Sequence, residues 1–275
     1  MSIKTILVHL ANDAGHRARL DAGRALARRY QAHLLLLYIT SPVHMPAAAA
    51  GRAASAVYLE EAHERARERA AEIEAEMART RIGPDMSWEF RIDGGKHIEV
   101  LTEYSHFVDL AIVGQPPERE ATDLVTLHRP DDLVLTAGCP VMVMPPVAAA
   151  PDLTGPVLVA WKASKEASRA VHGALAFLAT APKVYVLPAR RKGGLETPGV
   201  MIGDYLARHG ADVEVLPEDD DRGEPGERIR ARARELDCKL IVMGAYSRSR
   251  LSEFIFGGTT RHMLCNVDVP VLMSN

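Results

Sequence analysis

The sequence lacks features that mark several classes of protein. Only 3 of its 275 residues are cysteine, and Cys139, Cys238 and Cys265 show neither metal-ligand nor CxxC spacing, so we expect reduced and mostly buried thiols. No apolar run approaches the roughly 18 residues of a membrane-spanning helix. The first residues also lack the pattern of a signal peptide. We therefore expect a cytoplasmic protein without a membrane partner.

An excess of charge of either sign is also missing. The chain has 33 Lys and Arg against 36 Asp and Glu, and its formal net charge is -3. This balance provides no general attraction to nucleic acid, so we expect no nucleic-acid partner. With 47% hydrophobic and 25% charged residues, the composition is that of a soluble globular protein.

Common catalytic motifs are absent as well. The sequence contains no GxGxxG after a strand, no GxxxxGK[ST], no GxSxG and no HExxH. Its histidines are dispersed, and we interpret His262 as a packing or surface residue. No nucleophile has an evident base. We therefore predict neither catalytic residues nor a metal site, and a protein that is more a binder than an enzyme.

Apolar runs of strand length alternate with segments of helical periodicity along the first half of the chain. The expected strands are 6–8, 33–39, 87–92, 109–114 and 140–144, and the expected helices are 19–30, 57–80, 96–106 and 131–137. Strands that alternate with helices predict a parallel sheet covered by helices on both faces.

The same order starts again after a segment rich in proline and alanine, 145–156. The expected strands of this second half are 155–161, 183–187, 212–216, 239–243 and 269–273, and the expected helices are 166–180, 197–209, 227–236 and one that begins near 257. The halves can be aligned, because 111–114 (Ala-Ile-Val-Gly) matches 241–244 (Ile-Val-Met-Gly) at an offset of 130 residues. We predict a tandem duplication with domains at residues 1–147 and 154–275.

The loop after the strand at 239–243 carries the clearest candidate site. It begins at Gly244, contains small, hydroxylated and basic residues, and ends at 257–260 (Gly-Gly-Thr-Thr), where a helix opens. The first N–H groups of a helix have no partner within it and can hold an anion. The sequence therefore predicts a phosphate-binding loop.

This loop resembles that of the universal stress protein family. Nucleotide-binding members carry Gly, two residues, Gly, nine residues, then Gly followed by Ser or Thr. Gly244 and Gly257 take the first and third places, Ser247 replaces the second glycine, and Gly258 precedes Thr259. The resemblance covers nearly all of the chain, in the two-domain form of the family. It implies an α/β fold of two doubly wound parallel sheets, Rossmann-like and of the adenine nucleotide alpha hydrolase-like type, each of strand order 3-2-1-4-5.

The resemblance also implies a ligand and a role. The ligand is an adenine nucleotide, ATP in the first place, with Mg²⁺ as an additional candidate, and the role is that of a sensor or regulator in a stress response. The implied binding residues lie in the second half: Ala160, Lys162, Ser164, Leu187, Met243, Gly244, Ser247, Arg248, Arg250, Gly257, Gly258, Thr259 and Thr260.

Two departures from the family pattern leave other functions open. Lys162 stands where the family carries an acid after the first strand, and Ser247 stands where it carries a glycine. The alternatives are a structural or interaction protein that binds no nucleotide, and a weak nucleotide hydrolase. In the first half Asn12 and Asp13 keep the acid, but residues 116–118 (Pro-Pro-Glu) remove N–H donors and add a negative charge. We therefore expect nucleotide only in the second half.

The last strands of the two halves predict how the halves assemble. Both strands, 141–144 and 269–273, are short and apolar, and an unpaired apolar edge is a liability in water. We expect them to pair with each other within one chain, as an internal pseudo-dimer. We also expect a homodimer formed through apolar helix faces near 42–56.

Overall fold

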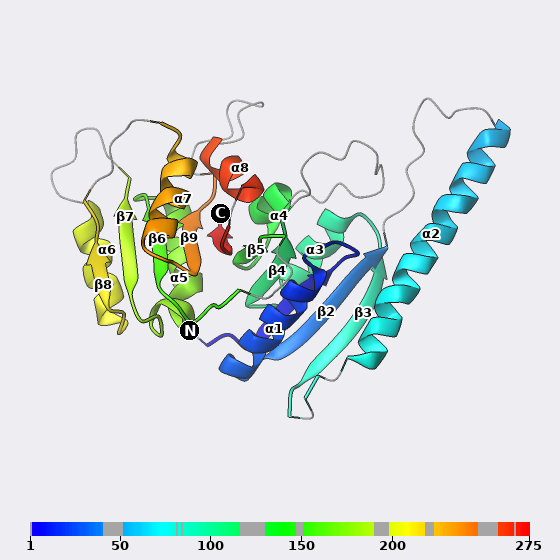
Figure 1. Cartoon of the computed structure of the whole chain (residues 1–275), viewed down its shortest axis with the longest axis horizontal. Helices are drawn as coiled ribbons and strands as arrows, with labels where there is room; N and C mark the ends of the chain where they lie inside the picture. Colours follow the sequence, from blue (N-terminus) through cyan, green and yellow to red (C-terminus); the bar gives the residue numbers. More distant parts are fainter. Residues whose placement is uncertain are drawn as a thin grey trace.

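One ten-stranded sheet runs through the part of the chain that the structure describes, and helices cover both of its faces (Figure 1). The structure is a computed structural model. It describes residues 2–40, 52–80, 82–83, 85–115, 130–146, 151–189, 198–217, 223–246, 258–266 and 268–275.

The first half contains the five strands and four helices that its sequence predicts. They are β1 (Thr5–Leu10), α1 (His16–Tyr30), β2 (His33–Thr40), α2 (Arg52–Arg79), β3 (Trp88–Gly94), α3 (His97–Ser105), β4 (Leu110–Gly114), α4 (Pro130–Thr136) and β5 (Val141–Met144). The largest difference from the prediction is at α2, which starts five residues before the expected 57.

The second half repeats this order, and its first five elements are shorter than their counterparts in the first half. They are β6 (Val157–Trp161), α5 (Lys165–Leu178), β7 (Val184–Pro188), α6 (Pro198–Arg208), β8 (Val213–Val215), α7 (Pro225–Glu235), β9 (Leu240–Gly244), α8 (Gly258–Cys265) and β10 (Val271–Ser274). The division into domains at 1–147 and 154–275 stays a prediction.

The strand order is β3-β2-β1-β4-β5-β10-β9-β6-β7-β8. Each half therefore has the predicted order 3-2-1-4-5, and all strand pairs within a half are parallel. The fold is α/β with two doubly wound units, as predicted.

The two halves meet at an antiparallel pair of their last strands. Met142 of β5 lies opposite Leu272 of β10, and both side chains are fully buried. The prediction of an internal pairing of these strands is confirmed. Burial of these two apolar edges against each other stabilises the contact between the halves.

Helices add further contacts across this seam. The ring of Tyr30 on α1 meets that of Phe177 on α5 edge-on at 5.6 Å, and its hydroxyl donates to the carbonyl of Ala176 at 3.2 Å. On the other face, Asn275 donates to the carbonyl of Leu135 on α4 at 3.3 Å. The halves are thus joined by the sheet and by packing on both of its faces.

Burial explains why the central strands read as continuous apolar runs. Five of the six residues of β1 are buried, because helices cover the sheet on both sides. One core packs the sheet against α1, α2, α5 and α6, and the other packs it against α3, α4, α7 and α8. The buried cysteines Cys139 and Cys238 belong to the second core, and burial raises the pKa of each thiol to about 12.

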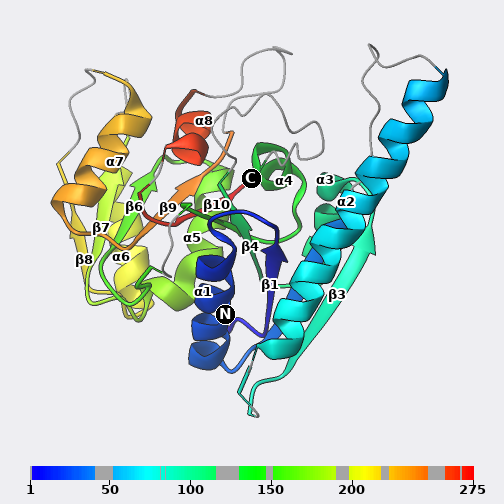
Figure 2. The ribbon, with the colours of Figure 1, turned by 45° about the vertical axis from the view of Figure 1, so that its right-hand side comes forward.

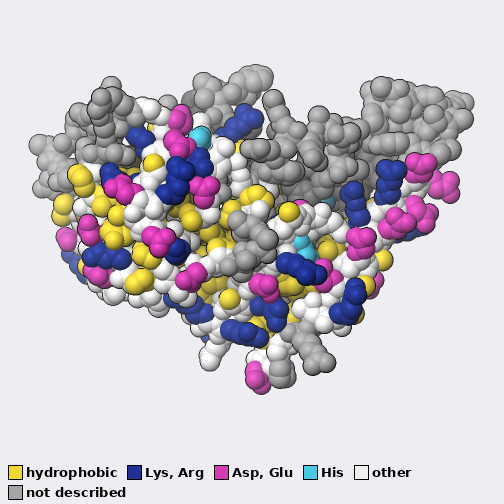
Figure 3. All heavy atoms as spheres, in the orientation of Figure 1, with side chains coloured by type: hydrophobic (Ala, Val, Ile, Leu, Met, Phe, Trp, Pro, Cys, Tyr) yellow, Lys and Arg dark blue, Asp and Glu magenta, His cyan; other side chains and the backbone are white. Residues whose placement is uncertain are grey.

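The surface carries both signs of charge. Figure 3 shows basic and acidic side chains interspersed over the described part of one face. No helix that the structure describes is long and apolar enough to cross a membrane. The apolar helix faces near 42–56, to which we assigned a homodimer contact, lie outside the residues whose side chains are described.

Candidate functional site

The carboxyl ends of three neighbouring strands form the floor of the candidate site in the second half. Ala160 on β6 is the register partner of both Leu187 on β7 and Met243 on β9. Leu187 and Met243 are 5% and 6% exposed, and Ala160 is half-buried. The structure thus brings together three residues that the sequence separates by up to 83 positions, and their side chains share one face of the sheet.

Two more predicted residues follow β6. Lys162 is exposed beyond the end of the strand. Ser164 is the N-cap of α5, and its hydroxyl accepts the N–H of Ala167 at 3.3 Å. An N-cap serine stabilises the first turn of its helix, so Ser164 has a structural task whether or not a ligand is present.

Gly244 ends β9 where the strand meets the start of α5. A Cβ at this position would lie 2.4 Å from the amide nitrogen of Ala167 and 2.8 Å from its Cα. Real contacts of a Cβ with backbone atoms are never so short, so only glycine fits between strand and helix. Gly244 is therefore required by packing, in addition to any role in the loop that follows.

Glu166 is a buried carboxylate beside this contact, and our sequence analysis did not single it out. It is 5% exposed, and burial alone would raise its pKa. The N–H of Glu166 itself, the hydroxyl of Ser164 and the ammonium of Lys165, 3.6 Å away, outweigh burial and lower the pKa of the carboxyl. In the sequence, Glu166 could have been recognised as an acid in the first turn of a helix whose N-cap is a serine.

The far end of the loop folds back onto its beginning. Thr260 in α8 is 4% exposed, and its hydroxyl accepts the N–H of Tyr246, two residues after Gly244, at 3.3 Å. At the start of α8, Gly258 is exposed and Thr259 is half-buried. The remaining predicted residues, Ser247, Arg248, Arg250 and Gly257, lie outside the described residues.

His262 has the packing role that its sequence context suggested. Its ring lies against Gly226 of α7, where a Cβ would approach the imidazole to 2.6 Å. Its Nε2 is 3.3 Å from Oε2 of Glu227, which also pairs with Arg230 at 2.7 Å. These contacts fix α8 on α7, so His262 supports the helix that opens after the loop.

The crevice of the first half is closed by one of its own side chains. Arg19 on α1 is 2% exposed, and its guanidinium donates to both oxygens of Asp13 at 2.8 and 2.7 Å. Its Nε donates to the carbonyl of His9 at 3.1 Å. A Cβ on Gly114 would lie 2.4 Å from Nη1 of Arg19, so the guanidinium fills the space between the ends of β1 and β4.

This finding revises our interpretation of Asp13. The sequence suggested that Asn12 and Asp13 preserve the family's ligand-binding acid. In the structure, Asp13 instead neutralises a buried arginine and accepts the N–H of Gly15 at 2.9 Å. Sequence periodicity did not reveal this, because an arginine within an otherwise apolar helix face is normally assigned to the surface.

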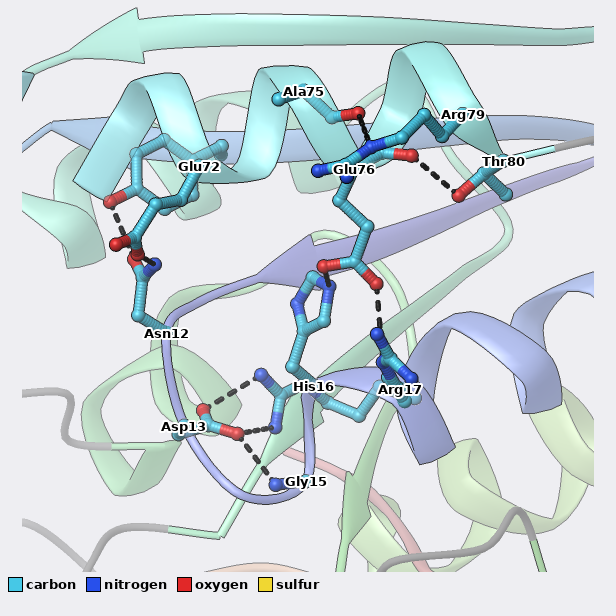
Figure 4. A network of polar contacts seen from close by, with 12 residues as sticks. Asn12, Asp13, Gly15, His16, Arg17, Glu72, Ala75, Glu76, Arg79 and Thr80 are labelled. Atoms are coloured by element: carbon cyan, nitrogen blue, oxygen red, sulfur yellow. Dashed lines mark hydrogen bonds and ion pairs between the residues drawn. The ribbon is translucent and has the colours of Figure 1, made fainter. Parts of the chain in front are cut away.

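A cavity of about 380 Å³ lies beside the same loop, between the start of α1 and the C-terminal part of α2. Figure 4 shows Asn12 pointing to Glu72, with Nδ2 and Oε2 3.2 Å apart, and His16 and Arg17 pointing to Glu76. Glu76 lies 3.3 Å from His16 and 3.4 Å from Arg17. Burial lowers the pKa of His16, and Glu76 opposes this change. The contacts of Asn12, His16 and Arg17 with Glu72 and Glu76 attach α2 to the start of α1.

Among the described residues, no three His, Cys, Asp or Glu side chains lie close enough together to hold a metal ion.

The protein is an α/β protein of two doubly wound units, and in its second half a strand that ends in glycine faces the start of a helix. The family model described as "Universal stress protein family" matches residues 154–275. The second half of the chain therefore carries a universal stress protein domain.

Solved structures show the same fold over the whole chain. A universal stress protein from Archaeoglobus fulgidus is similar with a TM-score of 0.72 and 16% identity, covering 100% of this chain and 97% of that one. A putative universal stress protein from Pseudomonas aeruginosa is similar with a TM-score of 0.57 and 20% identity, covering 98% and 92%. At these identities the likeness concerns the fold alone.

A curated relative shares part of the sequence. The stress response protein NhaX of Bacillus subtilis is 26% identical over 94 residues, which are 34% of this chain. The match spans 52% of the length of NhaX.

Proposed function

We propose that this protein binds an adenine nucleotide, ATP in the first place, at the crevice of its second half. In this proposal it acts as a cytoplasmic sensor or regulator in a stress response, and nucleotide occupancy is the signal that it reports. The name of the partial relative NhaX supports the stress-response role.

The observation that carries the proposal is the set of groups at or after the carboxyl ends of β6, β7 and β9. Ala160, Leu187 and Met243 offer an apolar floor on which a base can lie. Exposed Lys162 offers a positive charge, and Gly258 opens a helix. An apolar surface beside a cation and a helix start has the chemistry that a nucleotide requires.

The first half supports the proposal by contrast. There the guanidinium of Arg19 fills the equivalent crevice and already has a carboxylate partner in Asp13. A ligand would have to displace this ion pair and leave a buried charge unpaired, which is costly. We therefore propose one nucleotide per chain.

A second candidate, a structural or interaction protein that binds no nucleotide, is favoured by a different observation. Ser164, Gly244 and Thr260 each have a structural task in the fold without any ligand. Their presence is thus explained by packing and capping alone. A measurement on the protein has to separate the two candidates.

The test is a calorimetric titration of the full chain with ATP. The separated halves are unsuitable, because each would expose the apolar edge of β5 or β10. We expect one saturable site. The Lys162→Ala variant should bind about 10- to 100-fold more weakly, since a charge-assisted contact contributes roughly 1.5–3 kcal/mol.

Two controls make the result specific. Lys96→Ala removes an exposed lysine from the first half and should leave affinity unchanged. Ala160→Leu places a larger side chain on the floor, in the space that the base would occupy. It should weaken binding even if Lys162 contributes nothing. Absence of binding by the unmodified protein would refute the proposal and favour the second candidate.

A further inference from the structure

The two ends of the ten-stranded sheet differ strongly in length. At one end, β8 has three residues, whereas β3 at the other end has seven. Within the described part of the chain, no strand pairs with the outer side of β3. Figure 2 shows β3 as the right-hand strand of the sheet, with α2 in front of it.

The backbone of β3 presents an alternating set of groups on this outer side. The carbonyl of Ser87 accepts the N–H of Leu34 on β2, and β3 then continues in parallel register with β2. In a parallel pair every second residue bonds to the neighbouring strand. The N–H and C=O groups of Trp88, Phe90 and Ile92 therefore point outward.

Apolar side chains of the same residues remain partly uncovered. Trp88 is 37% exposed and Ile92 is 41% exposed, whereas Phe90 between them packs partly against the core. An edge strand with outward backbone groups and exposed apolar side chains is a template for pairing with another strand.

The charges on the opposite face of β3 indicate which strand fits. Arg91 is exposed and Glu89 is half-buried, and they bind each other, with Nη2 and Oε2 2.9 Å apart. They neutralise each other, which leaves Asp93, held by the hydroxyl of Tyr104 at 3.1 Å, as the remaining charge of β3 on this face. We propose that β3 is a homodimer interface, in which it pairs antiparallel with β3 of a second copy of this chain around a two-fold axis through Phe90.

This register gives the facing side chains favourable partners. With Phe90 opposite its counterpart, Glu89 of each copy faces Arg91 of the other, and Trp88 faces Ile92. Opposite charges and an aromatic residue beside a β-branched one are favourable cross-strand pairs. A shift of the axis to residue 89 or 91 would place two glutamates or two arginines directly opposite each other. The outward backbone groups of Trp88, Phe90 and Ile92 then bond across the axis.

This interface is independent of the proposed nucleotide site, which lies in the other half of the chain. It also differs from the contact near 42–56 that the sequence suggested. The result would be one continuous sheet through two chains, with the pseudo-two-fold seam of β5 and β10 inside each of them.

Sedimentation equilibrium of the full chain tests the proposal. We expect a reversible dimer. Glu89→Arg and Arg91→Glu should each weaken it about tenfold or more, because two symmetry-related pairs change from opposite to like charge. The double variant Glu89→Arg/Arg91→Glu should restore the affinity, since it exchanges the charges but keeps the pairs.

Controls separate this interface from general effects of charge. Glu214→Arg changes an exposed carboxylate on β8 at the opposite end of the sheet and should leave the dimer intact. Ile92→Pro removes one outward N–H without touching the bonds to β2 and should weaken the dimer. A monomer at all concentrations, a dimer unaffected by the single reversals, or no recovery in the double variant would each overturn the proposal.

Discussion

Replacing Asp13 with alanine removes the carboxylate that neutralises Arg19 inside the first half. The guanidinium is 2% exposed, and it would keep only the bond from Nε to the carbonyl of His9. Removing one partner of a buried ion pair costs about 3–5 kcal/mol of unfolding free energy. The side chain of Asp13 is itself 47% exposed, so water can reach the vacated position. We therefore expect a loss of about 2–3 kcal/mol.

The double variant Asp13→Ala/Arg19→Met provides the matched comparison. It removes the charge together with its partner and leaves a flexible apolar side chain in the crevice. It should be more stable than Asp13→Ala alone, because a buried unpaired charge costs more than a lost pair. Differential scanning calorimetry of both variants at the same pH measures this order.

Two results would refute the reasoning about this crevice. One is a change below about 0.5 kcal/mol for Asp13→Ala, which is the size expected of an ordinary surface substitution. The other is a double variant that is less stable than the single one, since this would mean that Arg19 stabilises the fold without Asp13.

Two other predictions concern the seam and the attachment of α2. Val271→Lys places a charge in fully buried β10 and should lower the unfolding free energy of the whole chain by about 3 kcal/mol or more; a well-folded variant with an unchanged melting temperature would contradict it. The folded state holds the pKa of His16 below its usual 6.5, so its contribution to stability is present above that pH and is lost as the pH falls below it. Between pH 7.5 and 5.5, the melting temperature of the His16→Gln variant should fall less than that of the unmodified protein. An equal fall in both proteins would exclude this contribution of His16.

The sequence predicted the fold well, because the pattern of buried strands is local. The run in β2, from Leu34 to Ile39, is apolar because both faces of the sheet are covered, and this can be seen without coordinates. The repeat at an offset of 130 residues then predicted two similar halves. The short apolar strands β5 and β10 predicted their own pairing, since each was expected to leave one apolar edge unpaired within its half.

The candidate site was only partly predictable. The sequence placed Ala160, Leu187 and Met243 near strand ends, and parallel strands bring such ends to one edge of a sheet. It could not show that Gly244 is required for contact with Ala167, because the two residues are 77 positions apart. A glycine required by packing and a glycine required by a ligand look the same in a sequence.

By itself, the sequence determined the order of strands and helices, the duplication and the pairing of the halves, since each follows from local apolar patterns. Only the tertiary structure decided that Arg19 fills the crevice of the first half and that His16 binds Glu76, 60 residues away. Periodicity shows which side of a helix faces the core, but not which charged side chain finds a partner there. That outcome depends on how α1, α2 and the ends of β1 and β4 pack around the same small volume.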